Sequence, residues 1–135
     1  MPRIQLRLYV QPGQAEVTLA IKAHNENYER ITAVIDTGAA VSLFPDYLLK
    51  NLDYRLSERR IIIEQAGIAG QAFEAVEAFV RVFLEDQSGS HTTEFEIRAW
   101  FADTDQPLLG FDGVLDRGIL HIDMPNRDGW LEITA

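Results

Sequence analysis

Apolar and polar residues alternate with a period of two along most of this chain. The turn residues Pro12-Gly13 interrupt the first such stretch, and the apolar positions on its two sides are Ile4, Leu6, Leu8 and Val10, then Val17, Leu19 and Ile21. A period of two is typical of half-buried β-strands, and a Pro-Gly pair favours a turn. Residues 1–23 are therefore predicted to form a β-hairpin.

Similar short segments continue to the end of the chain. Those with strand composition lie at 31–35, 41–44, 61–65, 73–84, 92–101 and 108–109, and a terminal hairpin is expected from 119–124 and 130–134. Short helices are expected at 47–49, just after Pro45, and at 111–117. So many short strands predict one all-β domain over residues 1–135, built as a sandwich or a barrel.

The composition excludes several classes of chemistry. A formal charge of −9 disfavours nucleic acid as a partner, because a polyanion is bound by clustered Lys and Arg. Without cysteine there is no disulfide, thiolate nucleophile or zinc-thiolate site. The three histidines, His24, His91 and His121, lack ligand spacing, so no metal or other cofactor is expected.

Hydropathy bears on where the protein works. The first residues alternate polar with apolar and lack the apolar stretch of a signal peptide. No window approaches the roughly 20 apolar residues of a membrane span. A soluble cytoplasmic protein without a membrane partner is the expectation.

One acidic turn stands out as candidate chemistry. The segment Asp36-Thr37-Gly38 follows the apolar run 31–35 and precedes the apolar run 41–44, so its carboxylate lies where uncompensated burial would cost several kcal/mol. Gly38 permits a tight turn, and such a turn directs backbone N–H groups at a carboxylate. Nearby Ser42 has no histidine in a recognisable arrangement, so it is predicted to satisfy local backbone groups and not to act as a nucleophile.

The strand-embedded Asp36-Thr37-Gly38-Ala39, followed by Val41-Ser42-Leu43, closely resembles the active-site segment of retropepsins, the single-domain aspartic peptidases of retroviruses and their cellular relatives. Two later segments agree in order and spacing. Gly67-Ile68-Ala69-Gly70 resembles the glycine-rich tip of the retropepsin flap, and Leu108-Leu109-Gly110-Phe111-Asp112 resembles the second signature of the family. The resemblance spans residues 15–134.

This resemblance implies a closed acid-protease barrel with one or two short helices. It also implies hydrolysis of peptide bonds by a water activated between two carboxylates that share a proton. Asp-Thr-Gly occurs once in the chain, so the second carboxylate has to come from Asp36 of a second protomer on a two-fold axis. The implied partners are an identical chain and an extended peptide or protein substrate.

The same resemblance implies a role for each matching residue. Asp36 is the catalytic carboxylate, Thr37 braces the two loops across the axis, and Gly38 offers its N–H to the carboxylate. Residues 66–71 form the flap that closes over substrate. The expected substrate-contact residues are Ala39, Ala40, Gly67, Ile68, Ala69, Gly70, Leu108 and Leu109.

Two departures indicate a cellular or bacterial type rather than a viral one. Many retroviral members carry acidic residues where this chain has Ala40 and Val41, and commonly an arginine where it has Phe111. The dimer then needs other contacts, and the terminal hairpin is the candidate. Two other interpretations stay open: a dimeric retropepsin-like module that binds peptide with little or no cleavage, and an unrelated small β-barrel whose acidic turn is structural.

Overall fold

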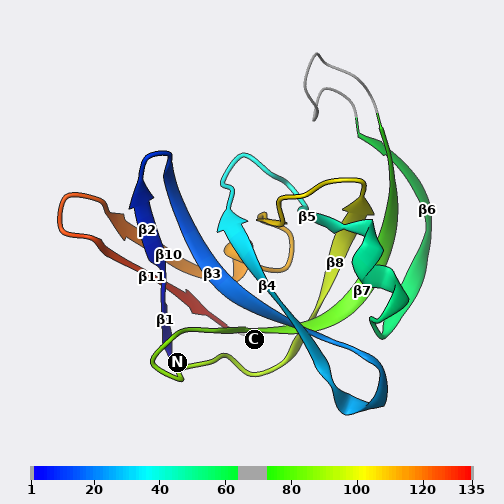
Figure 1. Cartoon of the computed structure of the whole chain (residues 1–135), viewed down its shortest axis with the longest axis horizontal. Helices are drawn as coiled ribbons and strands as arrows, with labels where there is room; N and C mark the ends of the chain where they lie inside the picture. The colour runs from blue at the N-terminus through cyan, green and yellow to red at the C-terminus, as the bar shows by residue number, and fades with distance from the viewer. Residues whose placement is uncertain (1, 64–72, 135) are drawn as a thin grey trace.

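The protein is all-β in the part that the computed structural model describes, residues 2–63 and 73–134 (Figure 1). The strands are β1 Arg3–Gln5, β2 Arg7–Val10, β3 Gly13–Lys22, β4 Tyr28–Ile35, β5 Ser42–Pro45, β6 Tyr54–Ile63, β7 Phe73–Glu85, β8 Phe95–Ala102, β9 Leu108–Leu109, β10 Gly118–Asp123 and β11 Asp128–Ile133. Short 3₁₀ turns lie at η1 His24–Glu26, η2 Asp46–Lys50 and η4 Leu115–Arg117.

The strands form two sheets. The larger has the order β2-β3-β4-β9-β5-β8-β7-β6, and the smaller has the order β1-β11-β10. Strand β3 is long enough to pair with β7 as well, with Leu19 opposite Leu84, so hydrogen bonding returns from β7 to β3. In Figure 1 the β6–β7 hairpin and the β10–β11 hairpin lie at opposite sides of the molecule.

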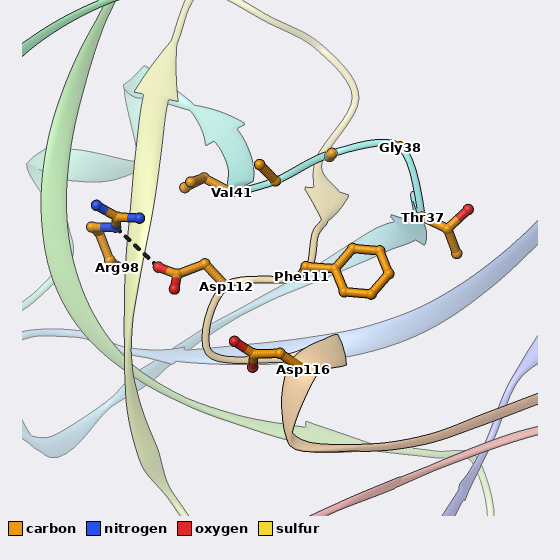
Figure 2. Close-up of a pocket in the computed structure, with 9 residues that line it drawn as sticks. Thr37, Gly38, Val41, Arg98, Phe111, Asp112 and Asp116 are labelled. Carbon is orange, nitrogen blue, oxygen red and sulfur yellow. Dashed lines mark hydrogen bonds and ion pairs between the residues drawn. The ribbon is translucent and has the colours of Figure 1, made fainter.

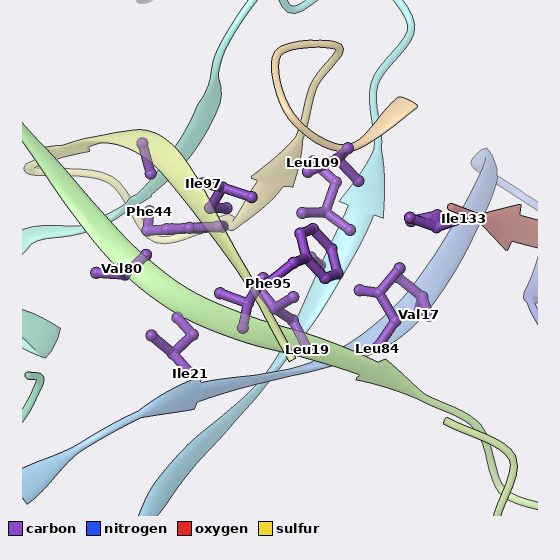
Figure 3. Packing of buried hydrophobic residues seen from close by; sticks show 14 of the residues in the cluster. Val17, Leu19, Ile21, Phe44, Val80, Leu84, Phe95, Ile97, Leu109 and Ile133 are labelled. Carbon is purple, nitrogen blue, oxygen red and sulfur yellow. The ribbon is translucent and has the colours of Figure 1, made fainter. Parts of the chain in front are cut away.

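The core lies inside the curvature of the larger sheet (Figure 3). Alternate residues of β3 point into it, as the period-two pattern predicts. Side chains from distant strands meet there, including Phe44, Val80, Phe95, Ile97, Leu109 and Ile133. Since Ile133 comes from β11, the smaller sheet packs against the same core. A small second cluster forms around Ala75 and Ala102.

Strand β9 has an unusual position between two strands that are neighbours in sequence. It pairs in parallel with β4, placing Leu108 opposite Val34, and antiparallel with β5, placing Leu108 opposite Leu43. The segment between β4 and β5 therefore loops over the end of β9. This segment contains Asp36-Thr37-Gly38, and β9 begins the second retropepsin-like motif.

The two predicted hairpins are confirmed in part. The terminal hairpin forms from β10 and β11, and β2 pairs with β3 around the predicted turn. The prediction that the first strand belongs wholly to the first hairpin was wrong, because β1 pairs with β11. The chain changes sheets at Leu6, whose N–H donates to the Gly129 carbonyl, 2.9 Å away.

Two further expectations need correction. The strand predicted at 61–65 begins earlier, at Tyr54, because its first half carries polar residues that hide the alternation. The helix predicted at 111–117 is limited to the 3₁₀ turn at Leu115–Arg117. Gly113 has a φ of +75°, and this left-handed conformation interrupts a right-handed helix.

Candidate active site

Asp36 follows the last residue of β4 and is half-buried. Its own N–H donates to the Leu109 carbonyl at 2.9 Å, continuing the pairing of β4 with β9 by one residue. The N–H of Gly38 donates to Asp36 Oδ1 at 2.8 Å, and the N–H of Ala39 donates to the Asp36 carbonyl at 3.1 Å. The turn thus provides a backbone donor for the carboxylate, as the sequence predicts.

The segment after β9 packs directly beneath this turn. The N–H of Phe111 donates to the Ala39 carbonyl at 3.0 Å, and the N–H of Asp112 donates to the Ala40 carbonyl at 2.9 Å. The N–H of Gly110 donates to the buried Ser42 hydroxyl at 3.0 Å. Ser42 therefore satisfies a backbone group, as predicted, but the expectation that this group is local was wrong, because Gly110 lies 68 residues further along the chain.

Gly110 is required by this close approach. A Cβ atom at this position would lie 2.6 Å from the Ala39 carbonyl oxygen and 2.9 Å from the Val41 carbonyl carbon. Both neighbours are backbone, so the acidic loop would have to move to accommodate a side chain. The lack of a side chain at Gly110 thus allows the second motif to pack directly against the loop that carries Asp36.

A hollow of about 340 Å³ opens beside Asp36. It is lined by Asp36, Gly38, Ala39, Ala40, Val41, Leu43, Trp100 and Leu108. This set includes the catalytic candidate and three of the expected substrate-contact residues, Ala39, Ala40 and Leu108. Leu109 lies elsewhere, because its side chain is fully buried in the core and only its carbonyl reaches Asp36.

A second hollow of about 500 Å³ lies against the same loop and contains opposite charges (Figure 2). Arg98 Nε donates to Asp112 Oδ2 at 2.9 Å, and Asp116 contributes a further carboxylate to the lining. The Phe111 ring and Thr37 line it as well. Phe111 is 43% exposed, so it presents an apolar surface next to the acidic turn.

Thr37 faces a third hollow, of about 330 Å³, between the N-terminal and terminal hairpins. Its lining includes Ile35, Ile122 and Met124. Thr37 is exposed, and Ile122 is 43% exposed although it belongs to a strand. The Asp-Thr-Gly turn therefore has an apolar surface on the side of Ile122 and Met124. Its other side faces the charged residues Arg98, Asp112 and Asp116.

The predicted flap lies outside the described residues. This applies to the segment 66–71 and to its four expected contact residues, Gly67, Ile68, Ala69 and Gly70. The strands that lead to and from it, β6 and β7, are paired over most of their length.

Sequence reasoning missed a polar network centred on Glu77 of β7. Its side chain is 1% exposed and accepts hydrogen bonds from Ser57 Oγ at 2.7 Å and from Trp100 Nε1 at 2.9 Å. The guanidinium groups of Arg98 and Arg59 lie 3.8 and 3.9 Å from Glu77 Oε2. The available signal was an acidic residue between Ala75 and Phe79 on one face of a long strand.

Burial alone would raise the pKa of the Glu77 carboxyl. The hydrogen bonds from Trp100 and Ser57, followed by the charges of the two arginines, outweigh burial and hold the pKa below its ordinary value. Glu77 is therefore a buried, ionised group. It is a member of a stabilised network and not a proton donor at neutral pH.

Within the part of the chain that the structure describes, three or more His, Cys, Asp or Glu side chains nowhere gather closely enough to hold a metal ion. Among the same residues there is no helix of the length and apolarity needed to cross a membrane. The chain matches no family model and no curated protein.

Proposed function

We propose that this chain is one half of a homodimeric aspartic endopeptidase with the retropepsin fold. In this proposal the Asp36 carboxylates of two protomers face each other at a two-fold axis and activate a water molecule. The proposal includes a closed barrel, and the return of hydrogen bonding from β7 to β3 supports it.

The observation that carries the proposal is the position of β9 under the acidic turn. The Leu109 carbonyl accepts a hydrogen bond from the N–H of Asp36. Gly110 lies so close to the backbone of Ala39 and Val41 that a side chain at this position would clash. These contacts fix the loop from below and leave a half-buried carboxylate at its surface. A structural turn would not need an apolar hollow beside its carboxylate, whereas a peptidase requires one for substrate.

The chemistry needs a second carboxylate. Two carboxyl groups about 3 Å apart do not both ionise, so one stays protonated and the pair can act as acid and base. The ionised carboxylate removes a proton from water as the water attacks the peptide carbonyl carbon. The protonated carboxyl group donates to the carbonyl oxygen, and the tetrahedral intermediate then collapses with proton transfer to the leaving amine.

The surface around Thr37 supports association with an identical chain. Apolar residues Ile122 and Met124 lie next to the turn, and β10 is the last strand in the order of the smaller sheet. A two-fold interface is self-complementary, so a patch next to the axis meets its own copy. Burial of these side chains would compensate for the missing arginine at the Phe111 position.

The direct experiment compares wild type with Asp36→Asn. The amide keeps the shape of the side chain and its acceptor oxygen for Gly38, so the fold and dimer are expected to persist. Cleavage of a diverse peptide library between about pH 4 and 7 should be lost, because an amide cannot exchange the shared proton. Circular dichroism and sedimentation provide the controls for fold and association.

The same comparison separates the alternatives. A dimeric wild type that binds peptides and never cleaves them would establish the peptide-binding module. A chain that stays monomeric at high concentration and cleaves nothing would establish a structural role for the acidic turn. Cleavage that survives Asp36→Asn would remove Asp36 from the mechanism.

A further inference from the structure

A single row of paired residues connects the hollow beside Asp36 to the buried Glu77. Leu108 of β9 is opposite Leu43 of β5, Leu43 is opposite Trp100 of β8, and Trp100 is opposite Glu77 of β7. Directly opposed residues in a sheet have side chains on the same face. Three members of this row, Leu108, Leu43 and Trp100, line the hollow, and the fourth lies behind the indole.

The Trp100 indole is fixed from two directions. Its ring packs with Leu43 against the small buried side chains Ala75 and Ala102. Its Nε1–H donates to Glu77 Oε2 at 2.9 Å. An indole N–H is only a donor, so a carboxylate is a matching partner and determines the orientation of the ring.

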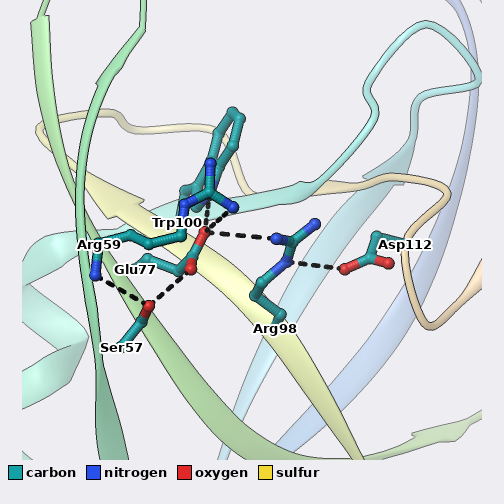
Figure 4. Close-up of polar contacts among 6 residues, drawn as sticks. All are labelled: Ser57, Arg59, Glu77, Arg98, Trp100 and Asp112. Carbon is teal, nitrogen blue, oxygen red and sulfur yellow. Dashed lines mark hydrogen bonds and ion pairs between the residues drawn. The ribbon is translucent and has the colours of Figure 1, made fainter.

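Glu77 is in turn held by groups from two neighbouring strands (Figure 4). Ser57 of β6 donates to its other oxygen, Oε1, at 2.7 Å. Arg98 of β8 lies 3.8 Å away and reaches on to Asp112, whose N–H is bonded to the acidic loop at Ala40. The indole is therefore connected to the β6–β7 hairpin on one side and to the loop of Asp36 on the other.

We propose that Trp100 is a specificity-determining wall of a substrate subsite beside Asp36 and that Glu77 is the positioning residue that holds its indole in place. The subsite takes an uncharged apolar side chain of a peptide. This assignment rests on the proposed peptidase function for the position of the substrate. The anchoring of the indole by Glu77 stands on the structure alone.

The lining determines the chemical class of the side chain. Val41, Leu43, Leu108 and the indole face are apolar, and Glu77 is covered, so the charge nearest to a bound side chain is Asp36 itself. An aliphatic or aromatic side chain gains by burial in this hollow, whereas a charged one loses its hydration without a partner. A fixed indole defines the depth of the hollow, and a mobile one does not.

The test of anchoring uses the indole N–H resonances of the full chain in ¹H–¹⁵N spectra. The chain has two tryptophans, and Trp130, in the other sheet and stacked on His121, serves as an internal reference. Glu77→Leu replaces the carboxylate with an apolar side chain of similar size and so removes the acceptor. It should move the Trp100 resonance and increase its hydrogen exchange by about tenfold or more, with Trp130 unchanged.

Glu77→Gln retains an acceptor oxygen and should restore most of the wild-type behaviour. Glu96→Gln is the matched control, because Glu96 lies on the same strand as Trp100 and makes an exposed ion pair with Arg55. An unchanged Trp100 resonance in Glu77→Leu would overturn the anchoring. An equal change of the Trp100 resonance in Glu96→Gln would also overturn the anchoring by Glu77.

The test of specificity uses peptides that differ at one position, carrying Leu, Phe, Ser or Asp. Wild type should prefer the apolar members, and both Trp100→Ala and Glu77→Leu should reduce that preference by about tenfold. For Glu77→Leu the change should appear in KM with kcat nearly unchanged. If both variants still cleave peptides and still prefer apolar side chains as strongly as wild type, the subsite proposal is wrong. The peptidase proposal would be unaffected by that result.

Uncleavable peptides of the same series separate the subsite proposal from the peptidase proposal. If wild type cleaves nothing, binding is followed through the Trp100 resonance. Selective shifts with apolar peptides would then support the subsite although the peptidase proposal had failed. No shift with any peptide at saturating concentration would overturn the subsite.

Discussion

The N–H of Gly110 donates a hydrogen bond to the hydroxyl oxygen of Ser42, 3.0 Å away, across 68 residues of sequence. Both residues are buried, and each belongs to one of the two motifs that resemble the retropepsin signatures. The hydroxyl thus joins the strand after the acidic turn to the segment beneath it. The bond is structural, so its loss should affect folding before it affects chemistry.

Ser42→Ala leaves the Gly110 N–H without this acceptor. We expect a loss of about 1–3 kcal/mol in the free energy of unfolding, since a buried unsatisfied donor keeps its full desolvation cost. Urea unfolding measures this, with the exposed Ser88→Ala as the control. The folded variant should still cleave peptide. Complete loss of cleavage with an unchanged unfolding curve would instead indicate a nucleophilic serine.

Gly110→Ala tests the backbone contact under the acidic loop. The added methyl group meets the Ala39 and Val41 backbone at 2.6–3.0 Å, so the loop has to shift, and overpacking of this kind costs about 1–3 kcal/mol or more. Cleavage should fall at least about a hundredfold, because small displacements of catalytic groups have large effects. Gly13→Ala is the control, since its Cβ would lie 3.8 Å from the nearest atom. Equal stability of the two variants would contradict the packing argument.

Glu77 provides a prediction about pH. Its pKa in the folded chain lies below the ordinary value of 4.5, so its contribution to stability is complete above that pH and is lost as pH falls through the folded pKa. Glu77→Gln should therefore be less stable than wild type by about 1–3 kcal/mol at pH 7. The difference should shrink progressively below pH 4.5. Urea midpoints measured from pH 7 to pH 3 test this, and a difference independent of pH would refute an ionised network.

The apolar surface near Thr37 provides a prediction about association. Ile122→Lys places a charge next to the proposed axis and should weaken the dimer at least about tenfold while the chain stays folded. Cleavage should decline in parallel. Leu56→Lys is the control, because Leu56 is also exposed but lies on β6, away from this surface. Sedimentation that finds the two variants equally dimeric would place the interface elsewhere.

Much of the β-structure could be predicted, because period-two alternation and turn residues are local signals. The alternation of Val17, Leu19 and Ile21 correctly indicated β3, and the terminal hairpin followed from its turn. The partner of β1 could not be predicted, since pairing with β11 depends on where the last strand lies in space. The left-handed conformation of Gly113, which prevents the expected helix, depends on how the second motif packs.

The candidate site was likewise predictable only in part from the sequence. The turn of Asp36 and the N–H of Gly38 follow from three adjacent residues, so their geometry was predictable. The role of Gly110 needed the structure, because the steric requirement comes from Ala39 and Val41. Trp100 and Glu77 were missed since they meet only through strand register and form no motif along the chain.

The central claim is that each active site uses one Asp36 from each of two chains. The most direct measurement mixes wild type with Asp36→Asn, allows the subunits to exchange, and records peptide cleavage per wild-type chain. If mixed dimers are inactive, an equal mixture should retain about half of that activity, and a growing excess of the variant should drive it towards zero. Activity per wild-type chain that stays constant at every ratio, with subunit exchange verified, would contradict the account.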